Sequence, residues 1–337
     1  MTRWLWIALA IGCSGDDKDA TGTDTDGTGD TDETFDTDGA RCQPVDPIVP
    51  VVAVLTPVII EFEGNNVLYG MPDSTPTGVV VYFHGAGGTA GDFSKTEQQA
   101  LMNQLAPFGW GYVAAESEDQ EPGHLWETTY DADNTDMARV VRALEHVASL
   151  TSLEADTPIV AMGFSNGGSA VGAFVDIYAD ELPIVAASFH NTNGAEPEGM
   201  PTIWIPAEND PKATPAQMEN SYEDLLANGE QSEYYLHEEL TLMPEMLQRN
   251  PELVAEEANV VFADMVASGL VDADGTRLVQ GDGDSLDKTL TNWAEKSAAP
   301  GAVRGAEMLR VIWALHRFSG YQAQEECAFL TGIVNQP

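Results

Sequence analysis

The feature that most constrains the fold of this chain is an apolar run without alternation, GVVVYF, at Gly78–Phe83. Such a run of β-branched and aromatic residues is typical of a strand covered on both faces, as in a parallel sheet. Between the predicted strands, an amphipathic pattern at 136–150 predicts a helix. Alternating strands and helices indicate an α/β fold, a three-layer sandwich with a mostly parallel sheet. The other predicted strands are 109–115, 158–162, 184–189, 202–207 and 308–315.

Between Asp210 and the strand predicted at 308–315 lies more chain than one crossover connection needs. A crossover helix is expected at 217–226, followed by a short strand at 233–237. The pattern beyond it predicts short helices that are interrupted at Asn250-Pro251. We therefore expect a helical cap, inserted at about 238–300 before the last strand of a catalytic domain that covers 45–337.

The motif Gly163-Phe164-Ser165-Asn166-Gly167 follows the strand predicted at 158–162. It matches G-x-S-x-G, in which the chain turns sharply from a strand into a helix and holds the serine in a strained conformation. The glycines are needed because a side chain at either position would collide with neighbouring backbone. The amide N–H groups at the start of the helix favour an anionic intermediate.

A serine hydroxyl is a poor nucleophile unless a base activates it. His316 follows the strand predicted at 308–315, and loops at the carboxyl ends of parallel strands collect the site in open α/β sheets. His237 also follows a predicted strand, so it remains the rival base.

The segments HGAGG (84–88), GFSNGG (163–168), AENDP (207–211) and WALHRF (313–318) occur in this order. Together they resemble the α/β-hydrolase superfamily over roughly 78–330. GFSNGG is most similar to the group that contains polyhydroxybutyrate depolymerases and feruloyl or acetylxylan esterases. The resemblance implies the α/β-hydrolase fold and the chain order serine, acid, histidine.

The same resemblance implies roles for individual residues. Ser165 is the expected nucleophile, His316 the base and Asp210 the acid, with Glu208 as the alternative acid. Two backbone N–H groups are expected to form the oxyanion hole, one from Asn166 and the other from Ala86 or, as the alternative, Gly87. The mechanism implied is two-step acyl transfer from a carboxylic ester, with no metal and no organic cofactor.

Three further residues are expected around a small or polymeric ester substrate. His84 lies in the turn after the first buried strand, and Trp126 and His190 are candidates for the pocket lining. A structural role is the alternative for His84, and a core position is the alternative for Trp126. For the whole chain, a serine peptidase with the same triad and a non-catalytic, surface-tethered binding protein are the competing functions.

The amino terminus has the pattern of an export signal. Residues 1–13 combine a basic start with a short apolar run, Trp4–Ile11, that ends at Gly12-Cys13. This resembles a bacterial lipoprotein signal peptide, which implies lipidation of Cys13 and anchoring to a membrane outside the cytoplasm; an ordinary signal peptide is the alternative. Residues 14–44 are rich in Asp, Thr and Gly, with little to bury, so they predict a disordered acidic linker.

The formal net charge of −41 constrains the partners. A surface of this sign repels phosphate backbones, which excludes nucleic acid, and it leaves the lipid anchor as the only expected contact with a membrane. Cys42 and Cys327 remain besides Cys13. In an exported protein they are expected either to form one disulfide or to stay unpaired.

Overall fold

A computed structural model describes residues 40–119, 123–194 and 197–335. The predicted signal peptide with Cys13, and the predicted linker up to residue 39, lie outside the described residues. Within the described ranges, none of the helices combines the length and the apolar character needed to cross a bilayer.

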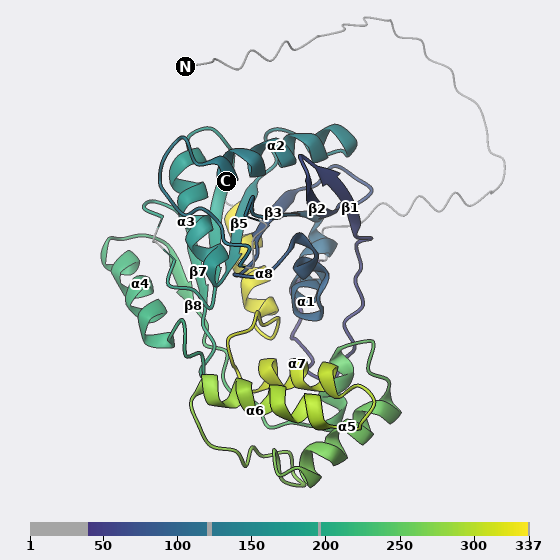
Figure 1. The fold of residues 1–337 in the computed structure, drawn as a ribbon. Helices are drawn as coiled ribbons and strands as arrows, with labels where there is room; N and C mark the ends of the chain where they lie inside the picture. Colours follow the sequence, from purple (N-terminus) through teal and green to yellow (C-terminus); the bar gives the residue numbers. More distant parts are fainter. Residues whose placement is uncertain (1–39, 120–122, 195–196, 336–337) are drawn as a thin grey trace, which may run out of the picture. The chain divides into compact units, whose positions relative to one another are not determined.

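One sheet of eight strands, in the order β1-β2-β4-β3-β5-β6-β7-β8, forms the centre of the domain (Figure 1). β2 runs antiparallel to both of its neighbours, and every other adjacent pair is parallel. The three-layer α/β architecture with a mostly parallel sheet is therefore confirmed. The strands are β1 (Val58–Phe62), β2 (Asn65–Gly70), β3 (Gly78–Phe83), β4 (Trp110–Ala115), β5 (Ile159–Phe164), β6 (Ile184–His190), β7 (Thr202–Ile205) and β8 (Ser232–Tyr234).

The hairpin of β1 and β2 was not expected from the sequence. Its turn consists of Glu63 and Gly64, both with positive φ, the geometry that joins twisted antiparallel strands through two residues. Val58 and Ile59 are exposed, and Ile60 and Phe62 are only partly buried against the core, so β1 lacks the continuous buried run that marks the central strands.

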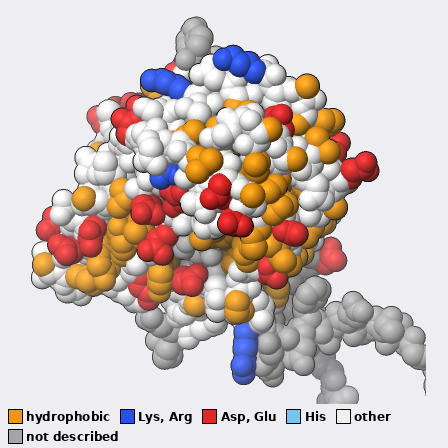
Figure 2. Space-filling model, turned by 90° about the horizontal axis from the view of Figure 1, so that it is seen from below, with side chains coloured by type: hydrophobic (Ala, Val, Ile, Leu, Met, Phe, Trp, Pro, Cys, Tyr) orange, Lys and Arg blue, Asp and Glu red, His pale blue; other side chains and the backbone are white. Residues whose placement is uncertain are grey.

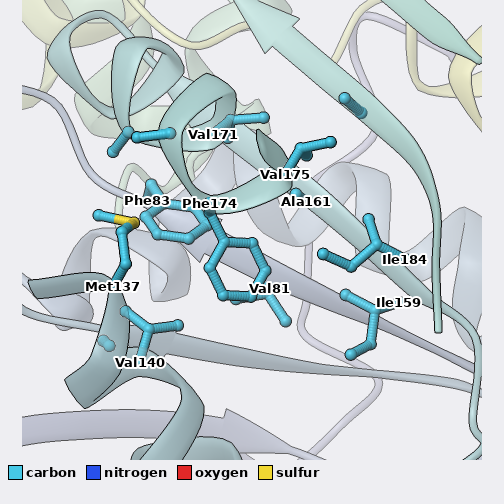
Figure 3. Packing of buried hydrophobic residues seen from close by; sticks show 14 of the residues in the cluster. Val81, Phe83, Met137, Val140, Ile159, Ala161, Val171, Phe174, Val175 and Ile184 are labelled. Carbon is cyan, nitrogen blue, oxygen red and sulfur yellow. The ribbon is translucent and has the colours of Figure 1, made fainter. Parts of the chain in front are cut away.

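Helices cover both faces of the sheet. α2 (Thr135–Leu150), α3 (Asn166–Tyr178) and α4 (Pro215–Ala227) share one apolar cluster with Val81 and Phe83. Figure 3 shows part of this cluster, with the rings of Phe83 and Phe174 packed against each other. α1 (Thr96–Leu105) and α8 (Ala323–Val334) pack on the other face, with Val80 and Tyr82. Successive residues of β3 thus point into two different cores, which explains its uninterrupted apolar run.

The cap follows β8 and has an apolar core of its own. It contains the 3-10 helix η4 (Pro244–Arg249) and the helices α5 (Ala255–Ala267), α6 (Gly283–Lys296) and α7 (Ala302–Ile312). The described part of the body also contains the short 3-10 helices η2 (Ala90–Ser94) and η3 (Ala106–Phe108). Seen from the cap end (Figure 2), the surface shows many acidic side chains and few basic ones among apolar patches.

The strand predicted at 308–315 is wrong, because this segment is the second half of α7 and the turn after it. Ala302, Ala306, Leu309 and Trp313 are all buried, at the spacing of one helix face. The run MLRVIWAL alone cannot distinguish a buried strand from a buried helix, and the helical period appears only when the residues before it are included. The helical insertion therefore lies after the last strand, β8, and not before one.

Two links tie distant parts of the chain together. A disulfide joins Cys42 to Cys327 in α8. In addition, Arg249 of the cap donates to both carboxylate oxygens of Glu97 in α1, at 2.9 and 3.2 Å, and both side chains are almost fully buried. Since a buried charge is tolerated only when it is paired, this ion pair fixes the contact between η4 and the body.

Candidate active site

Ser165 lies in a tight turn between β5 and α3, with φ 55° and ψ −122°. This conformation is strained for a residue with a side chain and is held by the surroundings. A Cβ atom at Gly163 would overlap the carbonyl group of Gly167, and one at Gly167 would overlap the carbonyl oxygen of Phe83. The turn thus depends sterically on both glycines, as the sequence predicted, and it leaves the serine at the carboxyl end of β5.

The structure brings Ser165, His316 and Asp210 together in one chain of hydrogen bonds. His316 Nε2 lies 2.8 Å from Ser165 Oγ, and His316 Nδ1 lies 2.6 Å from Asp210 Oδ2. A proton on Nδ1 is donated to the carboxylate, which leaves Nε2 as an acceptor for the serine proton. This is the geometry that general-base activation of a serine hydroxyl requires.

Asp210 is held in place by the turn that leads into α4. Its Oδ1 accepts the N–H groups of Lys212 and Ala213, at 2.7 and 3.1 Å, and its side chain has no exposed surface. Because Oδ1 is occupied, Oδ2 is the oxygen presented to His316. The carboxylate can therefore fix the orientation of the imidazole ring and stabilise its charged form.

The two alternatives that the sequence left open lie away from this chain of hydrogen bonds. His237 is buried, with Nε2 bonded to the carbonyl oxygen of Val311, and its ring is stacked on Tyr321. Burial lowers the pKa of the His237 imidazole. Glu208 is exposed and accepts the N–H of Glu239. No hydrogen bond joins either residue to Ser165 or His316 in the described structure.

Two backbone N–H groups flank the serine. Asn166 is the first residue of α3, where a helix leaves its N–H groups without a carbonyl partner inside the helix. Ala86 follows Gly85, where a Cβ atom would lie 3.2 Å from the Cβ of Ser165, so this turn packs directly on the serine. The N–H of Gly87 donates instead to the carbonyl oxygen of Gly123, at 2.5 Å. The N–H of Ala86, the other candidate donor in this turn, makes no such hydrogen bond to a described residue.

His84 and Trp126 are buried, and their hydrogen bonds go to the backbone of the turn and to residues beside it. His84 is fully buried and neutral: its Nδ1–H donates to Gly85 O, its Nε2 accepts the N–H of Ser117, and burial lowers the pKa of the ring. Trp126 donates its indole N–H to the His84 carbonyl and its backbone N–H to Asn166 Oδ1. Both side chains therefore brace the backbone around the candidate oxyanion hole.

His190 is also buried, at the end of β6. Its Nε2 lies 3.1 Å from Glu326 Oε1, which also accepts the hydroxyl of Ser188, and its ring is stacked on Phe318. The carbonyl oxygen of His190 accepts the N–H of Ser165. The structure thus places the side chain in the core under the site, and only its backbone reaches the serine turn.

Two asparagines hold the loop of His316, Asn191 and Asn209, and neither was predicted as a site residue from the sequence. Asn191 donates to the carbonyl oxygen of Arg317 and Asn209 to that of Trp313. The one available signal was their position two residues after the apolar segments at 184–189 and 202–207, where polar side chains meet at the edge of a parallel sheet. Among the described residues, no group of three His, Cys, Asp or Glu side chains is arranged to hold a metal ion.

No family model matches the sequence, and no curated protein matches it. Among solved structures, the chain is similar to a thermostable esterase with a TM-score of 0.38 and 15% identity, over 54% of each chain. It is also similar to the acylaminoacyl peptidase of Pyrococcus horikoshii (TM-score 0.40, 14% identity, 54% of this chain and 36% of that one). A hormone-sensitive lipase from a metagenome library gives a TM-score of 0.40 and 14% identity, over 56% of this chain and 75% of the other. The matched part spans less than two thirds of the first two proteins, and likeness at this level carries no information on substrate.

The chain's own topology defines the class of fold. A mostly parallel sheet, helices on both faces and a strained serine between β5 and α3 make an α/β-hydrolase fold.

Proposed function

We propose that this protein is a carboxylic-ester hydrolase that forms an acyl-enzyme on Ser165. The observation that supports the proposal is the arrangement Asp210–His316–Ser165, with hydrogen-bond distances of 2.6 and 2.8 Å. These groups come from three separate loops, and a role in packing alone does not require the serine to be strained and bonded to a histidine.

In the first step the Ser165 oxygen attacks the ester carbonyl while His316 Nε2 takes the serine proton. The carbonyl oxygen gains negative charge and is stabilised by the N–H groups of Asn166 and Ala86. The protonated imidazole, stabilised by Asp210, gives its proton to the departing alcohol. Water, deprotonated by His316, then attacks the acyl group and releases the acid and free Ser165.

A fluorophosphonate probe tests the nucleophile directly, because it phosphonylates activated serines and needs no knowledge of the natural ester. We expect the wild type to gain one adduct on the peptide that contains Ser165, and Ser165→Ala to gain none. Ser169→Ala is the matched control, since this serine lies on the same peptide one turn into α3, and it should label like the wild type. Labelling that persists in Ser165→Ala would contradict the proposal.

Substrate assays separate esterase from peptidase, since both use the same acyl-enzyme chemistry. We expect hydrolysis of nitrophenyl esters and no cleavage of the matching peptide anilides. A panel that adds feruloyl and acetylxylan esters and polyhydroxybutyrate tests the narrower resemblance of GFSNGG. If the protein cleaves only the anilides and needs Ser165 to do so, it is a peptidase.

We also propose that the protein is exported and tethered by a lipid on Cys13. The pattern of residues 1–13 supports this, and the Cys42–Cys327 disulfide is of the kind that persists in oxidising compartments. Incorporation of labelled palmitate in a bacterial host tests it. We expect label in the wild type and none in Cys13→Ala; equal labelling of the two would refute lipidation.

A further inference from the structure

The loop that carries His316 lacks the support that positions the other two residues of the site. Ser165 follows β5, and Asp210 lies just beyond β7, so the ladder of the sheet fixes the backbone that leads to each. His316 follows α7, a cap helix, and no strand of the described structure contains or precedes it directly. Its position relative to the sheet must therefore come from other bonds.

Asn191 supplies one of these bonds. It follows β6, is almost fully buried, and adopts a left-handed backbone conformation with φ 47°. Its side-chain Oδ1 accepts the N–H of Ala207 at 2.6 Å, and its Nδ2 donates to the carbonyl oxygen of Arg317 at 2.5 Å. The two partners fix the orientation of the amide, because one is a donor and the other an acceptor.

These contacts place Asn191 beside all three segments of the site. The residue before it, His190, accepts the N–H of Ser165, at 3.0 Å. Asn191 Oδ1 accepts the N–H of Ala207. The carbonyl oxygen of Ala207 in turn accepts the N–H of Asp210, at 3.1 Å. Arg317, to which it donates, directly follows His316. The side-chain amide of Asn191 thus connects the acid loop to the histidine loop, and the residue before it bonds to the serine turn.

Asn209 holds the other side of the same loop. Its Nδ2 donates to the carbonyl oxygen of Trp313, and its backbone N–H to that of Ala314, both at 2.9 Å. Ala314 has a φ of 49°, which is unfavourable for a residue other than glycine and shows that the loop is held in a constrained form. The segment before His316 is therefore anchored through Asn209, and the segment after it through Asn191.

We infer that Asn191 is a positioning residue for ester hydrolysis: through the Arg317 carbonyl it keeps the His316 imidazole aligned between Asp210 and Ser165. This inference rests on the proposed function. Proton transfer depends on near-ideal geometry, and a displacement of about 1 Å costs about 100-fold in rate. The loss of this amide should therefore lower kcat far more than it affects substrate binding.

Asn191→Gly is the variant that isolates the side-chain bonds, since glycine adopts the left-handed backbone without strain. We expect kcat for a nitrophenyl ester to fall about 10- to 100-fold while KM changes by less than about threefold. The rate of fluorophosphonate labelling of Ser165 should fall in parallel. Asn103→Ala is the matched control: Asn103 makes an equivalent pair of bonds, with the N–H of Val54 and the carbonyl of Val52, away from the site, and its loss should leave kcat unchanged.

A second measurement separates positioning from a general structural role. In a His316→Ala background the imidazole is gone, so adding Asn191→Gly should not reduce the residual rate further. If Asn191→Gly unfolds below the assay temperature, Asn191→Asp decides instead. The aspartate keeps the bond to Ala207 and the left-handed preference, but it turns a carboxylate oxygen toward the Arg317 carbonyl, so the same loss of kcat is expected.

The outcomes distinguish this inference from the proposed function. A wild type that hydrolyses esters, with a kcat of Asn191→Gly within about twofold of it, would overturn the positioning role and leave the esterase proposal intact. An equal further loss in the His316→Ala background would also overturn it. A wild type that neither hydrolyses esters nor reacts with the probe would refute the proposed function, and the positioning role with it.

Discussion

The sheet and the cap contribute to the candidate site in different ways. The sheet presents Ser165 and Asp210 at the carboxyl ends of parallel strands, through backbone that the ladder of hydrogen bonds holds in place. The cap ends in α7, and the loop after it delivers His316, held by side-chain amides from the sheet edge. The sheet region and the cap also have separate apolar cores. Ser165, Asp210 and His316 could all be located from the sequence, whereas the side-chain contacts that hold the His316 loop could not.

Replacement of Asp210, the proposed acid at the sheet edge, should lower kcat strongly. In Asp210→Asn, the oxygen stays with the N–H groups of Lys212 and Ala213, so the amide nitrogen faces His316 Nδ1. A donor there forces the proton of the imidazole onto Nε2, where it cannot accept the serine proton, and kcat should fall about 10⁴-fold. Glu208→Gln is the control at the same strand end and should keep its activity. Steady-state kinetics on a nitrophenyl ester measure both; an equal loss in Glu208→Gln would move the acid to Glu208.

The next largest effect is expected on the free energy of unfolding, from the buried ion pair between Arg249 of the cap and Glu97 of the body. Arg249→Met leaves Glu97 buried without its partner, which should lower the free energy of unfolding by about 3–5 kcal/mol. Arg304→Met breaks the exposed pair with Glu252 inside the cap and should cost less than about 1 kcal/mol. Urea unfolding measures both values. Equal effects of the two substitutions would show that the buried pair does not fasten the cap.

The disulfide should stabilise the body without affecting the chemistry. Replacing both Cys42 and Cys327 with Ser releases the first described residues from α8 and should lower the free energy of unfolding by about 2–4 kcal/mol. Ester hydrolysis well below the melting temperature should be retained, because neither residue contacts the site. Hydrogen exchange should increase around α8 and stay unchanged in α5–α7. Faster exchange in the cap helices would mean that the two regions are not independent.

The smallest expected effect is the pH dependence of the free energy of unfolding that two buried histidines, His84 and His237, cause. Burial lowers the pKa of His84 and of His237, so both are neutral when folded, whereas the unfolded chain protonates them below about pH 6.5. Stability is therefore full above that pH and falls as the pH drops, with a slope of at most about 1.4 kcal/mol per pH unit for each histidine. Urea unfolding between pH 7.5 and 5.5 measures this slope. His237→Gln should reduce this slope by the contribution of one histidine. An unchanged slope in this variant would contradict the conclusion that folded His237 is neutral.

Much of the sheet and part of the site followed from local patterns. β3 to β7 were predicted because strands buried on both faces are apolar throughout, and the serine turn was predicted because its glycines are sterically required. The hairpin had no such pattern, because β1 is exposed or only partly buried and β2 (NNVLYG) begins with two asparagines and ends with a glycine. α7 was mistaken for a strand, since its apolar face is continuous with the buried residues that follow it.

The remaining features depend on contacts between residues far apart in the chain. The pairing of Glu97 with Arg249, and the bond from Asn191 to Arg317, leave no mark on the sequence around either partner. His84, Trp126 and His190 lie near the site as expected, but their hydrogen bonds turn them inward, toward the backbone and the core. Only the packed structure shows which polar groups each ring meets.

We propose that His316, which follows the cap helix α7, is the base for Ser165, which follows strand β5. The most direct test compares kcat for a nitrophenyl ester in His316→Ala and His237→Ala, the two candidates that the sequence left open, at a temperature where both variants are folded. We predict that His316→Ala lowers kcat by about 10⁴- to 10⁶-fold, as removal of a triad histidine does, and that His237→Ala retains activity near that of the wild type. Normal turnover in His316→Ala, with loss in His237→Ala, would contradict the account.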